Sequence, residues 1–263
     1  MSCLPEFSPA LIQRLCDPKT GAGVDGIIVV MTSKKADALM RFYNSDGFEA
    51  EMCGNGVRCL MQYMRQKLFY PRLRCLLETK KRDILLSTDG SEVCVQMGNM
   101  DELGWDISYT HNKTRYTMHH IDSGVPHLVI FVDDVERIDV AKVGRYFRNH
   151  ARFKPQGTNV NFVSLAQDRG GLTGSIRTYE RGVEAETLAC GTGVTAAGYV
   201  LYKKLGYRTP ITLRVRSGQT LCVAIEPRTT GAENIYLKGP ADWVSDCTVA
   251  FDTEKQTCSL SRC

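Results

Sequence analysis

The strongest constraint on this chain is a phrase that occurs twice, first from Arg41 and again from Arg177. The first copy reads RFYNSDGFEAEMCGNGVRC and the second reads RTYERGVEAETLACGTGVT. Each copy begins Arg-x-Tyr, passes through Glu-Ala-Glu and ends in Cys-Gly-x-Gly-Val, and the two cysteines are Cys53 and Cys190. Three shared words in the same order predict an internal duplication. The alternative is two unrelated turns that each precede a helix.

Each cysteine is followed by apolar residues at helical spacing, which predicts a helix opening at each Cys-Gly-x-Gly. The second helix has Lys203 and Lys204 in its last turn and Gly206 just past its end, as helix C-termini prefer. The apolar positions are Val57, Leu60, Met61, Met64 and Leu68 in the first helix and Val194, Ala197, Leu201 and Leu205 in the second.

The start of such a helix is a suitable place for a thiol and an anion. Glycine lets the backbone come close to a ligand, and the first N–H groups of a helix lack intrahelical acceptors. The same positive helix end lowers the pKa of a thiol below its ordinary value of roughly 8.5. Two activated thiols and two anion cradles on related halves predict one site between the halves, where a small carboxylate has a thiol on each face.

Composition excludes several classes of protein. The 263 residues are 43% hydrophobic and 24% charged, with a net charge of +4. These values are typical of soluble globular proteins. Basic residues are too dispersed to indicate a nucleic-acid arm or a membrane patch. The longest apolar runs, IIVVM and LVIFV, are too short to span a bilayer. The eleven cysteines have no regular or zinc-like spacing and no preceding signal segment, so we expect reduced thiols in the cytoplasm and no metal.

Many short apolar strands with one long helix in each half predict a mixed α/β fold of two pseudo-symmetric domains, each a curled mixed sheet around a central helix. The regular pattern lapses from about Gly98 to Tyr109. We therefore place the domain boundary there, with domains at 1–98 and 99–245. The last strand is expected near Cys247, and the polar tail after Thr253 is expected to be frayed.

At these residues the chain closely resembles the diaminopimelate epimerase family. The matching stretches are GAGVDGIIVV, FYNSDGFEAEMCGNGVRC, GVPHLV, GTNVNF and YERGVEAETLACGTG, spread over nearly the whole chain in the family's order. The resemblance implies two pseudo-symmetric domains with the active site in the cleft between them, and it allows residues 246–263 to return to the first domain. It implies epimerisation of LL- to meso-diaminopimelate for lysine and peptidoglycan synthesis, without a cofactor, and a homodimer as found in many members.

The resemblance also assigns roles to individual residues. Cys53 and Cys190 would be the acid/base pair, and His127 would lie beside the site. Backbone amides would hold the carboxylate on the reacting carbon, and these belong to Gly54, Asn55, Gly191 and Thr192. Three residues would bind the distal carboxylate and one the distal ammonium, namely Asn44, Asn159 and Arg181, and Glu180.

Two departures from the family pattern bear on function. Family members begin with a strand and a His-Gly-x-Gly-Asn-Asp-Phe type phrase that contributes a substrate-binding Asn, and this chain has no such phrase. We expect either a start upstream of Met1 or a member that works without that strand. Many members also have Asn before the Pro-His pair, where this chain has Val125. That change removes a polar group from the pocket and would loosen substrate selection.

The chemistry requires a proton taken from one face of the α-carbon and another delivered to the opposite face. Two thiols on opposite sides do this without movement, and the pKa of Cys is close to neutral. No pyridoxal-phosphate signature is readable. Two alternatives stay open: a racemase or epimerase of another amino acid (glutamate, proline or hydroxyproline), and an inactive binding or redox protein on the same fold.

Overall fold

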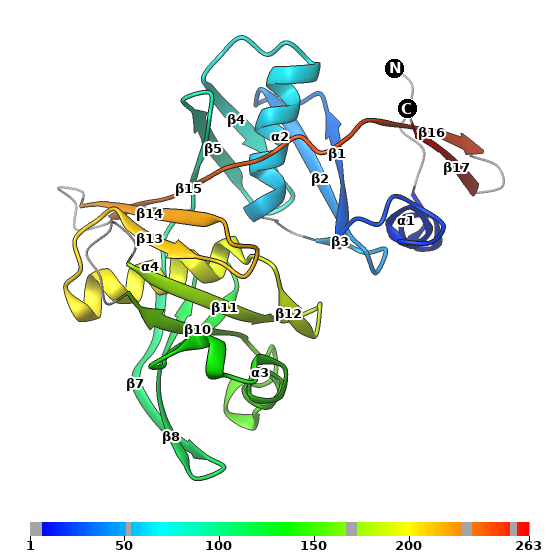
Figure 1. Ribbon diagram of the computed structural model, residues 1–263. Helices are drawn as coiled ribbons and strands as arrows, with labels where there is room; N and C mark the ends of the chain where they lie inside the picture. The colour runs from blue at the N-terminus through cyan, green and yellow to red at the C-terminus, as the bar shows by residue number, and fades with distance from the viewer. Residues whose placement is uncertain (1–6, 51–53, 167–172, 228–232, 253–256, 263) are drawn as a thin grey trace. The chain divides into compact units, whose positions relative to one another are not determined.

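The computed structural model describes the chain except for residues 1–6, 51–53, 167–172, 228–232, 253–256 and 263, so Cys53 lies outside the described residues. The chain divides into two compact units, residues 1–87 with 241–263 and residues 88–240. Both units combine helices with β-sheet, so the predicted mixed fold of strands and helices is confirmed (Figure 1). No helix in the described parts of the chain is long and apolar enough to cross a bilayer.

Unit 1 contains a sheet in the order β1-β2-β4-β5, with the short strand β3 also paired to β2. Strand β2 runs antiparallel to β1 and parallel to β4. Helix α1 begins with Pro at its first position after Ser8, whose hydroxyl caps the amide of Leu11. The elements are α1 (Pro9–Cys16), β1 (Gly26–Met31), β2 (Ala38–Asn44), β3 (Glu49–Ala50), α2 (Gly54–Lys67), β4 (Arg74–Glu78), β5 (Asp83–Thr88), β16 (Cys247–Asp252) and β17 (Thr257–Arg262).

Unit 2 contains a sheet in the order β6-β15-β14-β13-β11-β10-β9-β8-β7, with β12 paired to β11. The elements of its first half are β6 (Val93–Gln96), β7 (Asp101–His111), β8 (Thr114–Asp122), β9 (Pro126–Phe131), η1 (Val135–Arg137), α3 (Val140–Arg148) and η2 (Ala151–Phe153). Those of its second half are β10 (Asn159–Leu165), β11 (Gly174–Glu180), β12 (Ala185–Thr187), α4 (Gly191–Leu205), β13 (Ile211–Arg214), β14 (Thr220–Pro227) and β15 (Glu233–Gly239).

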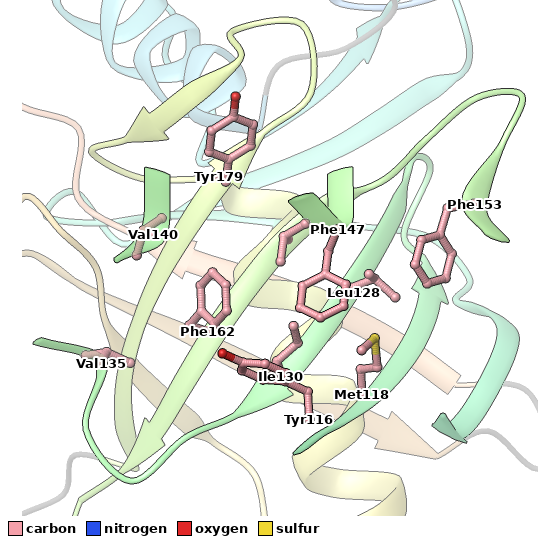
Figure 2. Close-up of a cluster of buried hydrophobic side chains, with 11 residues drawn as sticks. Tyr116, Met118, Leu128, Ile130, Val135, Val140, Phe147, Phe153, Phe162 and Tyr179 are labelled. Carbon is pink, nitrogen blue, oxygen red and sulfur yellow. The ribbon is translucent and has the colours of Figure 1, made fainter. Parts of the chain in front are cut away.

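Strand β10, in the interior of the unit 2 sheet, has a different helix on each face. Its residues Val160 and Phe162 belong to a buried apolar cluster with Val140 and Phe147 of α3 (Figure 2). Because side chains alternate along a strand, Asn159 and Asn161 face the other side. That side is packed against α4, which is buried along most of its length. Strand β10 therefore carries polar residues on the face that it presents to α4.

The two predicted helices after the cysteines are confirmed. Helix α2 begins at Gly54 and buries Val57, Leu60, Met61 and Met64 as the periodicity requires, whereas Leu68 follows its last residue, Lys67, and is exposed. Helix α4 begins at Gly191 and ends at Gly206, which adopts the left-handed conformation with φ of 68°. A glycine is favoured there because a β-carbon destabilises that conformation.

The stretch from Gly98 to Tyr109, where the sequence pattern lapses, is largely the strand β7. It forms a hairpin with β8 and contains register shifts between Glu102 and Ile107. Its side chains are exposed or half-buried, so no apolar alternation marks it in the sequence. The tail after Thr253 was expected to be frayed, but residues 257–262 form β17, which pairs with β16.

The duplicated phrase folds into the same motif in each unit. Strands β2 and β3 pair Tyr43 with Glu49, and strands β11 and β12 pair Tyr179 with Glu186. Both tyrosines are buried. Each glutamate also pairs with the arginine that opens its phrase, because Arg41 binds Glu49 and Arg177 binds Glu186, each through two nitrogens.

These pairings correct the alignment that the words of the sequence indicate. Glu-Ala-Glu spans 49–51 in the first copy and 184–186 in the second, so the matching words equate Glu49 with Glu184. The structure equates Glu49 with Glu186 instead, and each lies four residues before its cysteine. The additional residue of the second copy lies in its loop, residues 180–185, against 44–48 in the first copy. Asn44 and Glu180 occupy corresponding positions directly after the paired tyrosines.

Candidate active site

The thiol of unit 2 lies at the N-terminus of α4. Cys190 is the N-cap residue with an extended backbone (φ −124°, ψ 104°), and it is only 5% exposed. Its Sγ lies 3.4 Å from Oγ1 of Thr192. The first intrahelical bond runs from the amide of Val194 to the carbonyl of Cys190. The amides of Gly191 and Thr192 precede that bond and have no acceptor within the helix, so this end of α4 suits a carboxylate.

Gly193 allows a close approach between α4 and the sheet. A β-carbon at this position would lie 2.2 Å from Oδ1 of Asn161 and 3.4 Å from Sγ of Cys190. Only glycine fits this contact without displacing a neighbour. The carboxamide of Asn161 and the thiol of Cys190 therefore both lie next to Gly193.

Asn161 is fully buried and is held by three hydrogen-bonding contacts. Its Nδ2 donates to the carbonyl of Leu128 at 2.8 Å and lies 3.1 Å from Nδ1 of His127. Its Oδ1 accepts from the hydroxyl of Thr178 at 2.9 Å. The parallel pairing of β9 with β10 brings these residues together, since it aligns Asn159 with His127 and Asn161 with Val129.

His127 is completely buried, as is expected of a structural or an active-site histidine. Burial and, to a smaller extent, the positive charge of Arg181 lower the pKa of His127 to about 3. The imidazole is therefore neutral at neutral pH. Its Nε2 lies 3.5 Å from Nδ2 of Asn159.

Asn159 and Arg181 form a second part of the unit 2 site. The side-chain oxygen of Asn159 accepts from the backbone amide of Arg181 at 2.8 Å, and its Nδ2 donates to the carbonyl of Pro126 at 3.2 Å. The side chain of Asn159 is only 4% exposed. Asn159 thus positions the backbone of Arg181. The half-buried guanidinium of Arg181 donates from Nη1 to the carbonyl of Gln156 at 3.2 Å.

Glu180 ends β11 beside Arg181 and is half-buried. Its Oε2 accepts a hydrogen bond of 2.9 Å from the hydroxyl of Thr187 on the neighbouring strand β12. This bond fixes one oxygen of the carboxylate. Because hydrogen bonds to a charged group are stronger than neutral ones, Thr187 restricts the orientation that Glu180 presents to a ligand.

Unit 1 contains the predicted residues Asn44, Gly54 and Asn55. The half-buried side chain of Asn44 forms no hydrogen bond with the residues that the structure describes. In α2, the buried Arg58 donates to the carbonyl of Gly54 at 3.3 Å and to Oδ1 of Asn55 at 3.0 Å. Arg58 thereby places a positive charge at the first turn of α2, directly after the position of Cys53 in the sequence.

The structure places the predicted residues other than those of unit 1 in unit 2, namely His127, Asn159, Glu180, Arg181, Cys190, Gly191 and Thr192. It adds four residues of unit 2 that the sequence did not single out. These are Ser123, Asn161, Thr178 and Thr187. Ser123 is buried, and its hydroxyl donates to the carbonyl of Thr192 at 3.1 Å, which ties the β8–β9 turn to the start of α4. Asn161 lies within the GTNVNF stretch, where polar and apolar residues alternate. That alternation is the sequence signal that could have identified it. The described residues contain no cluster of three or more His, Cys, Asp or Glu suited to a metal.

Comparison with solved structures defines the class of fold. A hydroxyproline epimerase from Agrobacterium vitis superposes with a TM-score of 0.68 and 16% identity over 87% of this chain and 75% of its own. A probable proline racemase from Agrobacterium radiobacter superposes with a TM-score of 0.69 and 15% identity over 94% of this chain and 88% of its own. The fold is therefore the one shared by these proteins.

Sequence comparison then defines the family. The diaminopimelate epimerase family model matches residues 3–102 and 119–244. A diaminopimelate epimerase of Hydrogenobaculum sp. is 35% identical over 256 residues, covering 92% of this chain and 86% of the relative. One from Aquifex aeolicus is 38% identical over 218 residues, covering 81% and 76%. The chain belongs to the diaminopimelate epimerase family.

Proposed function

We propose that this protein epimerises LL-diaminopimelate to meso-diaminopimelate without a cofactor, in the synthesis of lysine and peptidoglycan precursors. The observation that carries the proposal is the buried thiol of Cys190 at the start of α4, beside helix amides that suit a carboxylate. Family membership adds the substrate, since the relatives at 35% and 38% identity are diaminopimelate epimerases.

In this mechanism Cys53 and Cys190 are the two acid/base groups. One enters as a thiolate and removes the α-proton, and the electron pair of the C–H bond moves toward the substrate carboxylate. The other enters as a thiol and delivers its proton to the opposite face of the same carbon. The two residues then exchange roles for the reverse direction. Cysteine suits both roles because its pKa is readily shifted toward neutral pH.

Charge that develops on the α-carboxylate needs fixed donors. The amides of Gly191 and Thr192 serve in unit 2, and those of Gly54 and Asn55 serve in unit 1 in the same manner. Preorganised donors of this kind stabilise a transition state by roughly 3 kcal/mol each. No reorganisation is required at the moment of proton transfer, because the helix holds the amides in place.

The distal half of the substrate is also an amino acid and needs a second set of contacts. We assign its ammonium to Glu180, whose carboxylate Thr187 orients. We assign its carboxylate to Arg181 and Asn44, with Asn159 holding the backbone of Arg181. A guanidinium binds a carboxylate through two parallel hydrogen bonds, which a lysine in its place could not do.

The test is proton NMR of LL-diaminopimelate in D₂O with the reduced protein. We expect loss of the α-proton signal and appearance of the meso isomer. The variants Cys53→Ala and Cys190→Ala should abolish turnover, whereas Cys222→Ala on β14 should retain it. Epimerisation retained by either active-site variant would contradict the two-thiol mechanism. Turnover of glutamate or proline in place of diaminopimelate would instead identify another substrate.

The same chemistry bears on the compartment that we propose. Both thiols must stay reduced, which fits a small-molecule enzyme of the reducing cytoplasm. A homodimer is proposed from the family resemblance, and sedimentation equilibrium would test it.

A further inference from the structure

The polar cluster beneath the start of α4 has a member with no role in the mechanism above. Asn161 is fully buried, yet it is a polar residue in an interior strand whose first five residues are all buried. A buried carboxamide is retained without penalty only where its N–H groups and its oxygen all find partners. The partners of Asn161 show what it fixes.

The hydrogen bonds of Asn161 determine which terminal atom of its carboxamide is the nitrogen and which is the oxygen. The carbonyl of Leu128 can only accept, so it selects the amide nitrogen at 2.8 Å. The hydroxyl of Thr178 then donates to the remaining oxygen at 2.9 Å. With one N–H directed to Leu128, the second N–H of the same nitrogen is directed to Nδ1 of His127 at 3.1 Å.

This assignment has a direct consequence for His127. A neutral imidazole carries its proton on one nitrogen only, so a ring whose Nδ1 accepts must carry the proton on Nε2. Nε2 lies on the side of Asn159, whose oxygen holds the backbone amide of Arg181. Nδ2 of Asn159 donates to the carbonyl of Pro126 and lies 3.5 Å from Nε2, a longer contact than the 3.1 Å between Nδ2 of Asn161 and Nδ1. The shorter contact identifies Nδ1 as the acceptor.

We propose that Asn161 is a positioning residue that holds His127 as the neutral Nε2–H tautomer and fixes it relative to Cys190 across Gly193. The expected effect on the turnover of diaminopimelate rests on the proposed function. The assignment of the His127 tautomer does not. No other residue of similar size fills the position equally well. Aspartate cannot donate to Leu128 or to Nδ1, leucine leaves both without a donor, and the glutamine side chain is one methylene longer in a site already in contact with Gly193.

The position of Asn161 also explains the second glycine of the Cys-Gly-x-Gly word in unit 2. The carboxamide that orients His127 lies against Gly193, and the thiol of Cys190 lies against the same residue. A change in the orientation of Asn161 therefore reaches both His127 and Cys190. The close approach at Gly193 makes the helix start and the histidine one rigid unit.

The test is ¹⁵N NMR of the histidine rings in the whole protein, which does not require turnover. The protein has five histidines, and the His127 signals are those missing from His127→Gln. We expect a neutral ring with a protonated Nε2 and an unprotonated Nδ1 across neutral pH. In Asn161→Asp the carboxylate accepts in place of donating, so the proton should move to Nδ1. We expect kcat/KM for diaminopimelate to fall by between about 10-fold and about 100-fold.

A matched control is available on the β7–β8 hairpin. There the amide of Asn112 lies 3.1 Å from Nε2 of His111, in an exposed contact of the same kind. Asn112→Asp should alter the His111 signals and leave both His127 and kcat/KM unchanged. If Asn161→Asp does not fold, Thr178→Val provides the second variant, because it removes the hydroxyl that orients the carboxamide. We expect mixed His127 tautomers in Thr178→Val.

A protonated Nδ1 in the unaltered protein would overturn the proposal. Unchanged His127 signals in both Asn161→Asp and Thr178→Val would overturn it as well. If the signals change as expected but diaminopimelate is not turned over by the unaltered protein, the tautomer assignment stands and the proposed function fails.

Discussion

Replacing Gly193 by alanine tests the close approach between α4 and Asn161. The new β-carbon would lie 2.2 Å from Oδ1 and 3.2 Å from Cγ of Asn161, and real β-carbons essentially never come within 3.0 Å of another atom. Asn161 cannot yield freely, because it is fully buried and bonded to Leu128, His127 and Thr178. Either the carboxamide gives up a bond or the start of α4 moves outward.

The magnitude follows from opposing effects. Alanine is a better helix former than glycine by about 1 kcal/mol, which favours the variant. Overpacking a buried site destabilises by about 1–3 kcal/mol, and a buried polar group left without its partner costs about 1–3 kcal/mol more. We therefore expect Gly193→Ala to lower the free energy of unfolding by about 1–5 kcal/mol, with about 3 kcal/mol as the central value. Catalysis should fall as well, since His127 and Cys190 both depend on this contact.

The assay uses the two tryptophans of the chain. Trp105 lies in unit 2 and Trp243 in unit 1, so in a Trp243→Phe background the fluorescence of Trp105 reports unfolding of unit 2 in urea. The control is Gly206→Ala at the other end of α4. That glycine has a φ of 68° with open space around it, so the backbone strain should amount to about 1 kcal/mol and activity should persist.

Two results would refute this reasoning. The first is a Gly193→Ala variant that is as stable as Gly206→Ala. The second comes from a double-mutant cycle with Asn161→Ala, which removes the atoms that the new β-carbon meets. The destabilisation by Gly193→Ala should shrink by about 1–3 kcal/mol in that background, and strictly additive effects would show that Asn161 is not the obstacle.

Three further predictions follow from single contacts. Thr187→Val should lower kcat/KM about 10-fold with little change in stability, because Glu180 loses the bond that orients it; steady-state kinetics check this. His127 has a pKa of about 3 when folded and about 6.5 when unfolded, so the unfolded state binds the proton first as pH falls. The free energy of unfolding should therefore drop by about 1.4 kcal/mol per pH unit below about 6.5 until pH 3, and His127→Gln should reduce that slope in urea titrations. Arg177→Lys should destabilise its unit by about 1–2 kcal/mol and Arg41→Lys by less, because the side chain of Arg177 is 12% exposed and that of Arg41 is 44% exposed; thermal unfolding of the two variants decides this.

Local signals made part of this fold predictable from the sequence. The helices after Cys53 and Cys190 were predicted because glycines and apolar spacing lie within one short segment, and Gly206 marks the end of the second. The duplication was predicted because its words are repeated in order. Strand β7 was missed for the opposite reason, since its exposed side chains and register shifts leave no apolar alternation.

Non-local pairing explains what the sequence could not provide for the site. His127 and Asn161 are 34 positions apart, and only the parallel pairing of β9 with β10 makes them neighbours. Thr187 reaches Glu180 across the pairing of β12 with β11. The equivalence of Glu49 with Glu186 was also hidden, because two identical words in the sequence matched out of structural register.

The register of the duplicated motif has a consequence for how such a protein can diversify. Glu49 and Glu186 each stand four residues before a cysteine, whereas the loops preceding them, residues 44–48 and 180–185, differ in length. The two copies thus differ in length before the glutamate of the ion pairs Arg41–Glu49 and Arg177–Glu186, which we call the arginine–glutamate clamp. Between that glutamate and the cysteine their lengths are equal. The clamp isolates the thiol from changes in the loop that carries Asn44 or Glu180. Under the proposed mechanism, new ligand preferences can therefore arise by exchanging a loop while the cysteines that transfer protons are retained.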